Sequence, residues 1–135
     1  LEGVCDGTVD VIATDHAPHS AAEKAKGLAG SAMGIVGLET AFGVLHTRLV
    51  QTGIITLEKL LDMMSVRPRK IFGMAGGALE AGMPADLALL DTEKNWTVDP
   101  AAFKTMGRAT PFAGWQLQGQ NRMTILRGEI VYEAL

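Results

Sequence analysis

A short apolar run that ends abruptly in a proline-containing turn most constrains what this chain can fold into. Residues 9–14, Val-Asp-Val-Ile-Ala-Thr, are mostly apolar or β-branched, which is typical of a buried strand in a parallel sheet. Pro18 lacks a backbone donor and pushes Ala17 toward extended geometry, so the strand is predicted to end there. Such a strand must pair with neighbours that this chain does not contain. We therefore expect a fragment of a larger α/β fold. The first residue, Leu1, is not Met, which favours the same expectation.

Helices are predicted for the middle of the chain. The stretch after the turn is rich in small residues and glycine, which indicates a long loop of the kind that forms lids or binding loops. Apolar residues then recur at helical spacing, with Gly53 as a stop and Thr56 as the next N-cap. The expected elements are a loop over 20–34 and helices over 37–51, 57–64 and 65–71.

From Gly73 onward the pattern changes to that of a small β region. Turn-forming glycines and Pro84 precede an alternating run, and a second alternation flanks Gly128-Glu129, which predicts a hairpin with a glycine-first turn. We expect two units, 1–73 and 74–135. The strands expected in the second unit are 86–91, a short one at 96–98, and the hairpin around 123–132, with 99–121 irregular.

Charge and cysteine content exclude several classes of protein. The 135 residues include 12 Lys and Arg against 15 Asp and Glu, a net charge of −3 with no basic stripe, so a nucleic-acid partner is not expected. No 18-residue apolar run is present, so a membrane span is not expected either. A single cysteine, Cys5, cannot form an internal disulfide, which favours a reducing, cytoplasmic setting. We expect Cys5 to be a small buried apolar group.

Asp15 and His19 are the candidate functional residues. They follow the predicted strand at its carboxyl end, the edge at which α/β folds bind their ligands. A carboxylate at that position can bind zinc or act as a general base, and an imidazole can donate an N–H to an anionic substrate group. The alternative is that Asp15 merely forms a turn. We expect His16 to have a local structural role and His46 to be a packing residue.

Several ordered segments of the chain resemble one enzyme family. The run Val9-Asp-Val-Ile-Ala-Thr-Asp-His-Ala-Pro-His19 and the stretch Met33 to Phe42 are similar to bacterial long-chain (class I) dihydroorotases of the amidohydrolase superfamily. The similarity covers essentially the whole chain. It resumes at 82–91, 110–114 and 124–132.

The resemblance implies a fold, a reaction and a set of site residues. Residues 9–14 would be the last strand of a metal-dependent (β/α)₈ barrel, and the β region would be part of a small β-sandwich. The reaction would be the reversible cyclisation of N-carbamoyl-L-aspartate to dihydroorotate in pyrimidine synthesis. Asp15 would be a zinc ligand and the proton shuttle, His19 would bind the substrate carboxylate, and the backbone at Met33 and Gly34 would border the substrate.

Most of the metal ligands of that family are not in this chain. Its His-x-His pair, two further histidines and a carboxylated lysine or carboxylate have no counterpart here, and the chain has only three histidines. One Asp cannot supply the three protein ligands that a catalytic zinc normally has. The resemblance implies one or two zinc ions in an intact, homo-oligomeric enzyme. Because the other ligands lie outside this chain, we expect no catalysis by this stretch of chain alone.

Two alternatives remain open from the sequence. The first alternative is that the parent protein is not an active enzyme but a non-catalytic dihydroorotase-like subunit that scaffolds aspartate carbamoyltransferase. A hydantoinase- or allantoinase-like cyclic amidase is the second alternative, because those families resemble the Asp-His part of the motif.

Overall fold

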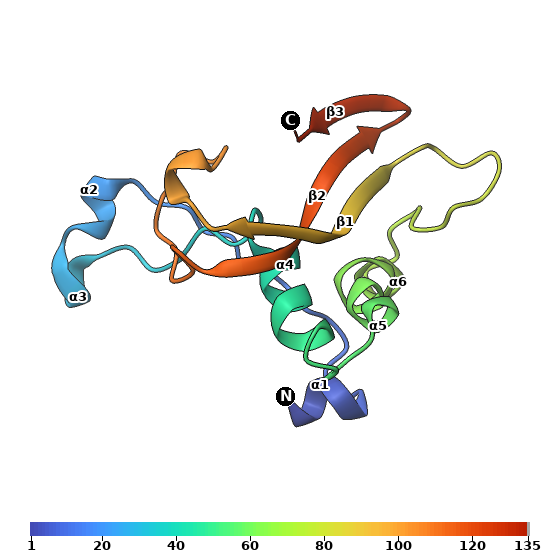
Figure 1. Cartoon of the computed structure of the whole chain (residues 1–135), viewed down its shortest axis with the longest axis horizontal. Coiled ribbons are helices and arrows are strands. Elements are labelled where there is room, and N and C mark those ends of the chain that lie inside the picture. Colours follow the sequence, from blue (N-terminus) through green and yellow to red (C-terminus); the bar gives the residue numbers. More distant parts are fainter. Residues whose placement is uncertain (135) are drawn as a thin grey trace.

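The computed structural model describes residues 1–134. Helices from residues 2–6 and 41–71 lie on one side of a small antiparallel sheet, and a long extended segment that ends in two short helices reaches away from both (Figure 1). The helical elements are α1 (Glu2–Asp6), α2 (Ala21–Lys24), α3 (Gly27–Gly30), α4 (Ala41–Leu45), the π-helix η1 (His46–Val50), α5 (Leu57–Leu61), the π-helix η2 (Asp62–Val66), α6 (Arg67–Ile71) and the 3₁₀-helix η3 (Pro100–Ala102). The strands are β1 (Leu87–Thr97), β2 (Gln116–Leu126) and β3 (Glu129–Glu133).

The three strands form one sheet in the order β1-β2-β3, with both pairs antiparallel. Helix α4 packs closely against this sheet because Gly43 has no side chain. A Cβ at Gly43 would lie 2.9 Å from the Trp96 ring and 3.0 Å from the Gly119 carbonyl oxygen. The core beside this contact consists of Val36, Val98, Phe103 and Leu117.

A second apolar cluster joins the helices to one another. Leu49 of η1 and Leu60 of α5 are buried together with Ile55, which lies between the two helices. The backbone continues from α4 into η1 and from α5 through η2 into α6, so the predicted helices over 57–64 and 65–71 form a single helical run. Pro68, which cannot donate a hydrogen bond, follows the π-helical turn η2. None of the helices in residues 1–134 has the length and apolar character needed to cross a bilayer.

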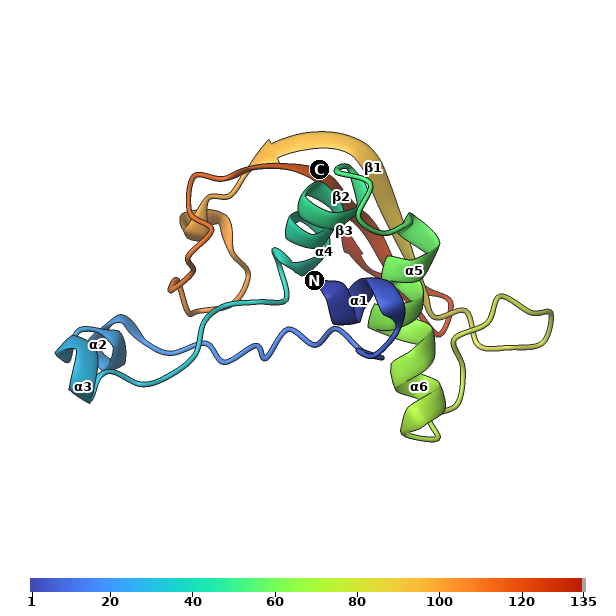
Figure 2. The ribbon, with the colours of Figure 1, turned by 90° about the horizontal axis from the view of Figure 1, so that it is seen from below.

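The prediction of a strand over 9–14 is wrong for this structure. These residues form an extended trace without regular pairing (Figure 2). The backbone N–H groups of Val9 and Ile12 donate to the carbonyl oxygens of Gly3, at 2.8 Å, and Met63, at 3.2 Å. An isolated parallel bridge between His16 and Ile35 follows beyond the segment. The physical reason is that the described residues contain no second parallel strand to receive its backbone groups.

Three other predictions need correction. The loop over 20–34 contains the short helices α2 and α3, and the helix predicted from residue 37 begins at Ala41. The stretch 99–121 is not irregular throughout, because β2 begins at Gln116. The start of β2, Gln-Leu-Gln-Gly-Gln-Asn, is mostly polar and lacks the apolar alternation that predicts a strand. Only Leu117 and Gly119 among these residues are buried.

The hairpin between β2 and β3 forms as predicted, but its turn lies one residue earlier. Leu126 pairs with Glu129, so the two turn residues are Arg127 and Gly128. Their φ angles are 51° and 85°, and positive values at both positions define a type I′ turn. Before β1, residues 72–86 form an exposed connection from α6 to the sheet.

Candidate active site

Asp15 lies at the bend between the extended segment and the loop that carries His19. Its φ angle is +46°, in the left-handed region, where aspartate is one of the few non-glycine residues found regularly. The side chain is exposed. On its amino-terminal side, Thr14 packs against Gly37, where a Cβ would come within 2.9 Å of the Thr14 carbonyl oxygen.

The segment that begins at Gly34 lies directly beside the Asp15 loop. The Ala17 N–H donates to the Ile35 carbonyl oxygen over 3.0 Å. A Cβ at Gly34, whose φ is +124°, would lie 2.5 Å from the Ala17 Cβ and 2.6 Å from the Ala17 carbonyl oxygen. Contact between two backbones therefore already explains the glycine at position 34.

His16 joins the same two segments through its side chain. Its Nδ1 accepts the backbone N–H groups of Gly37, at 3.1 Å, and Leu38, at 3.2 Å. A nitrogen that accepts hydrogen bonds carries no proton, so the neutral ring has its hydrogen on Nε2. This confirms the prediction that His16 has a local structural role.

His19 is fixed over the other end of the loop. Its Nε2 lies 2.7 Å from the Met33 carbonyl oxygen, to which it donates, and its Nδ1 lies 3.9 Å from a Glu23 carboxylate oxygen. Glu23 belongs to a capping box at the start of α2, in which the hydroxyl and the N–H of Ser20 donate to the carboxylate and lower the pKa of Glu23. The Met33 side chain itself is exposed.

Lys24 and Glu39 are two contributors that the sequence analysis missed. The Lys24 ammonium donates to the carbonyl oxygens of Ala32, at 2.8 Å, and Gly34, at 2.9 Å, and so ties the ends of the loop together. The Glu39 carboxylate accepts the N–H groups of Lys104, at 2.7 Å, and Thr105, at 3.0 Å. The capping-box spacing from Ser20 to Glu23 was a signal for α2 and hence for Lys24, whereas no local pattern marks Glu39.

The segment that follows the backbone held by Glu39 also contacts the Asp15–His19 loop. A Cβ at Gly107 would lie 2.7 Å from the Pro18 Cβ, and the Val36 N–H donates to the Ala109 carbonyl oxygen over 2.8 Å. The loop is thus in contact with residues 34–38 and with Gly107, and these two segments are hydrogen-bonded to each other. Ala109 contributes its backbone to this contact.

Three of the four predicted site residues lie close together. His19, Met33 and Gly34 meet where the two segments converge. Within residues 1–134, no hydrogen bond or ion pair joins the Asp15 carboxylate to these three residues; the Ala17 backbone connects them instead.

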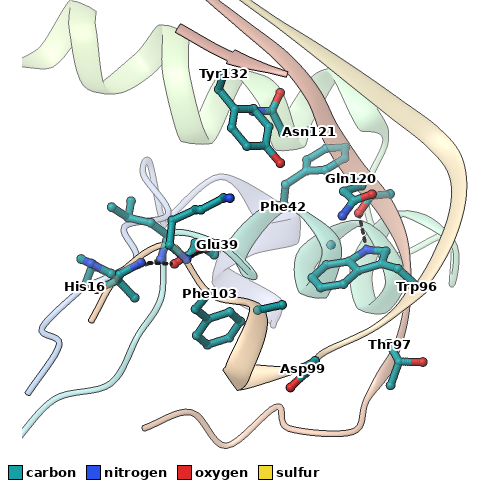
Figure 3. Close-up of a pocket in the computed structure, with 16 residues that line it drawn as sticks. His16, Glu39, Phe42, Trp96, Thr97, Asp99, Phe103, Gln120, Asn121 and Tyr132 are labelled. Carbon is teal, nitrogen blue, oxygen red and sulfur yellow. Dashed lines mark hydrogen bonds between the residues drawn. The ribbon is translucent and has the colours of Figure 1, made fainter. Parts of the chain in front are cut away.

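A pocket in the described part of the chain lies apart from these residues. It has a volume of about 620 Å³ and lies between α4, the sheet and residues 99–105 (Figure 3). Apolar side chains such as Phe42, Trp96 and Phe103 line it, and the Trp96 N–H donates to the Gly119 carbonyl oxygen over 2.9 Å. His16 borders this pocket, whereas the four predicted site residues are not among its lining residues.

The other two candidate groups have clear surroundings. His46 is buried, stacks on Phe42 at a centroid distance of 5.4 Å and hydrogen-bonds the Gln118 carbonyl oxygen through Nδ1, so the prediction of a packing residue is confirmed. The prediction that Cys5 is buried is wrong. Cys5 is exposed on the short helix α1, and its thiol faces the Ile54 carbonyl oxygen at 3.8 Å.

The described residues do not form a complete metal site. In residues 1–134, no three His, Cys, Asp or Glu side chains lie close enough together to hold an ion. A catalytic zinc normally takes three protein ligands, so Asp15 can supply at most one of them.

The chain belongs to the amidohydrolase family, whose sequence profile matches residues 1–131. Its relatives include the dihydroorotases of Bacillus caldolyticus and Geobacillus kaustophilus, each 51% identical over 98% of this chain and 31% of the relative. The chain therefore spans about a third of the length of these relatives.

Solved structures of hydantoinases share the fold. The L-hydantoinase of Arthrobacter aurescens superposes with a TM-score of 0.88 at 32% identity, over 98% of this chain and 30% of the hydantoinase. A D-hydantoinase superposes with a TM-score of 0.90 at 22% identity, over 98% of this chain and 30% of that one, and this likeness concerns the fold alone. The family match and these superpositions confirm the prediction of an amidohydrolase-type α/β fold.

Proposed function

We propose that this chain is the C-terminal part of a zinc-dependent dihydroorotase, which interconverts N-carbamoyl-L-aspartate and dihydroorotate. The observation that carries the proposal is the 51% identity to curated dihydroorotases over 98% of the chain. The Asp-His-Ala-Pro-His run, with Asp15 at a constrained bend, supports it.

The proposal gives residues 9–14 a structural role. They would be the last strand of a (β/α)₈ barrel, paired with strands that lie outside this chain, and this agrees with their extended course without regular pairing. Residues 1–73 would belong to the barrel and residues 74–135 to a small β-sandwich. The antiparallel sheet β1-β2-β3 is the element that supports the sandwich.

Each candidate residue has a distinct proposed task. The Asp15 carboxylate would be one zinc ligand and would carry a proton toward the ring nitrogen that leaves during hydrolysis. Bound zinc, as one or two ions, would supply an activated water. A substrate carboxylate would compete with the Met33 carbonyl oxygen for the N–H of His19, which brings the substrate beside the backbone of Met33 and Gly34.

The proposal is tested with the full-length protein that contains this chain. Purified with zinc, it is expected to hydrolyse dihydroorotate and to form it from N-carbamoyl-L-aspartate, both followed by ultraviolet absorbance. Zinc removal with a chelator should abolish both directions, and zinc should restore them. Absence of either conversion in the zinc-loaded protein would refute the proposal.

Hydantoinase activity is the second candidate. The 32% identity to the L-hydantoinase favours it specifically, since the superposition covers 98% of this chain. Turnover of hydantoin or allantoin at a higher kcat/KM than dihydroorotate would establish this alternative in place of the first.

A cytoplasmic homo-oligomer and association with aspartate carbamoyltransferase are further parts of the proposal. A parent protein that binds this transferase but has no cyclic-amidase activity would be a scaffold rather than an enzyme. Size-exclusion chromatography of the two purified proteins, alone and mixed, distinguishes these cases when it is combined with the activity assay.

Replacing His19 with alanine in the full-length protein is expected to raise KM for dihydroorotate about 10–100-fold, the cost of losing a hydrogen bond to a charged group. kcat should change much less, because the carboxylate that His19 binds does not react. The control is Glu23→Gln, which removes the charge 3.9 Å from the His19 ring and keeps the imidazole. A loss confined to kcat would contradict this role.

A further inference from the structure

The side chain of His16, the residue after Asp15, binds the turn that leads into α4. One ring nitrogen, Nδ1, accepts two backbone N–H groups, those of Gly37 and Leu38, at 3.1 and 3.2 Å. Both donors belong to the turn that leads into α4. His16 itself is half-buried at the border of the large pocket (Figure 3).

The backbone at Asp15 requires such support. A non-glycine residue with φ of +46° is in a sparsely populated conformation, and such a conformation persists only where surrounding contacts hold it. On one side, Thr14 packs on Gly37; on the other, the Ala17 N–H donates to Ile35. His16 supplies a side-chain link between these two contacts, next to the bend itself.

We propose that His16 is a positioning residue, which fixes the left-handed bend at Asp15 through the two hydrogen bonds that its Nδ1 accepts. This inference rests on the proposed function, in which Asp15 carries a proton. The imidazole contributes as an acceptor and touches neither substrate nor reacting atoms. Any side chain that places an acceptor at the Nδ1 position should therefore replace it.

Three substitutions in the full-length protein separate this role from others. His16→Asn keeps an acceptor, because Oδ1 is the same number of bonds from Cα as Nδ1. His16→Gln places its acceptor one bond further out, near the position of Nε2. His16→Leu retains bulk and removes the acceptor altogether.

Two measurements are made on each variant. Hydrogen–deuterium exchange of peptides that cover 14–17 and 36–39 reports on the bend and on the two amides, independently of activity. Steady-state kinetics with dihydroorotate separate kcat from KM. His16→Leu and His16→Gln are expected to exchange faster in both peptides and to lose about 10–100-fold in kcat, the usual effect of removing a partner that orients an active-site group. Their KM should stay near the wild-type value, and His16→Asn should resemble wild type in every respect.

Several results would overturn the proposal. His16→Asn as impaired as His16→Leu would mean that the Nε2 side of the ring matters, and a rise in KM at constant kcat would mean substrate contact. Unchanged exchange and kcat in all three variants would mean that the bend needs no such link. If His16→Leu does not fold, the comparison of asparagine with glutamine decides. If the wild-type protein turns over no cyclic amide, the proposed function fails, while the exchange data still decide whether His16 holds the bend.

Discussion

Replacing Asp15 with asparagine in the full-length protein is expected to lower dihydroorotase kcat by about 10²–10⁴-fold, the usual contribution of a general acid–base group. An amide at this position cannot take up and release the proton. The fold should persist, because asparagine accepts the φ of +46° as readily as aspartate does. Turnover of dihydroorotate measures the effect, and circular dichroism verifies the fold.

The matched control is Asp10→Asn on the same extended segment. Asp10 is exposed and lies 3.5 Å from the Arg67 guanidinium, an ion pair of the surface kind that contributes little to stability. This variant should keep wild-type turnover. If Asp15→Asn also kept it, the carboxylate at the bend would have no part in the reaction, and Asp15 would be only a turn residue.

Replacing Gly34 with alanine is expected to destabilise the full-length protein by about 2–5 kcal/mol. The new methyl group would lie 2.5 Å from the Ala17 Cβ and 2.6 Å from its carbonyl oxygen, so one of the two backbones must move. The φ of +124° adds a strain of its own. Urea unfolding followed by circular dichroism measures the loss of free energy.

Gly82→Ala separates the strain from the collision. Gly82 has a φ of +90°, and no atom lies within 4 Å of the position that its Cβ would occupy. Its replacement should cost only about 1–2 kcal/mol, the cost of the backbone conformation. Equal losses at the two positions would show that Ala17 does not restrict Gly34.

The parts of the fold that sequence predicted depend on local signals. Helical spacing after Leu38, the N-cap at Thr56 and the alternation around Gly128 located the helices and the hairpin to within a few residues. The segment 9–14 shows the opposite case. Its composition is that of a buried strand, yet a strand exists only where a neighbour accepts its hydrogen bonds.

The candidate site was predictable in its residue types but not in its supports. His19 and Gly34 each follow from a contiguous stretch of the sequence, residues 9–19 and 33–42. Gly107 contacts Pro18 of the Asp15–His19 loop, although the two residues are 89 positions apart in the sequence. Glu39 matters because it binds the segment that leads to Gly107. Contacts over such separations depend on the arrangement of whole elements, and a carboxylate that accepts two backbone N–H groups leaves no pattern in neighbouring residues.

The exposed connection over 72–86 has a consequence for the integrity of the molecule. On either side of it, the two halves of the polypeptide are joined by the packing of α4 on the sheet, by Glu39 and by the hydrogen bond from Val36 to Ala109. Covalent continuity through this connection adds little to those contacts. Proteolytic cleavage of this connection would therefore leave the two halves associated as a non-covalent complex, in the same arrangement as in the intact chain.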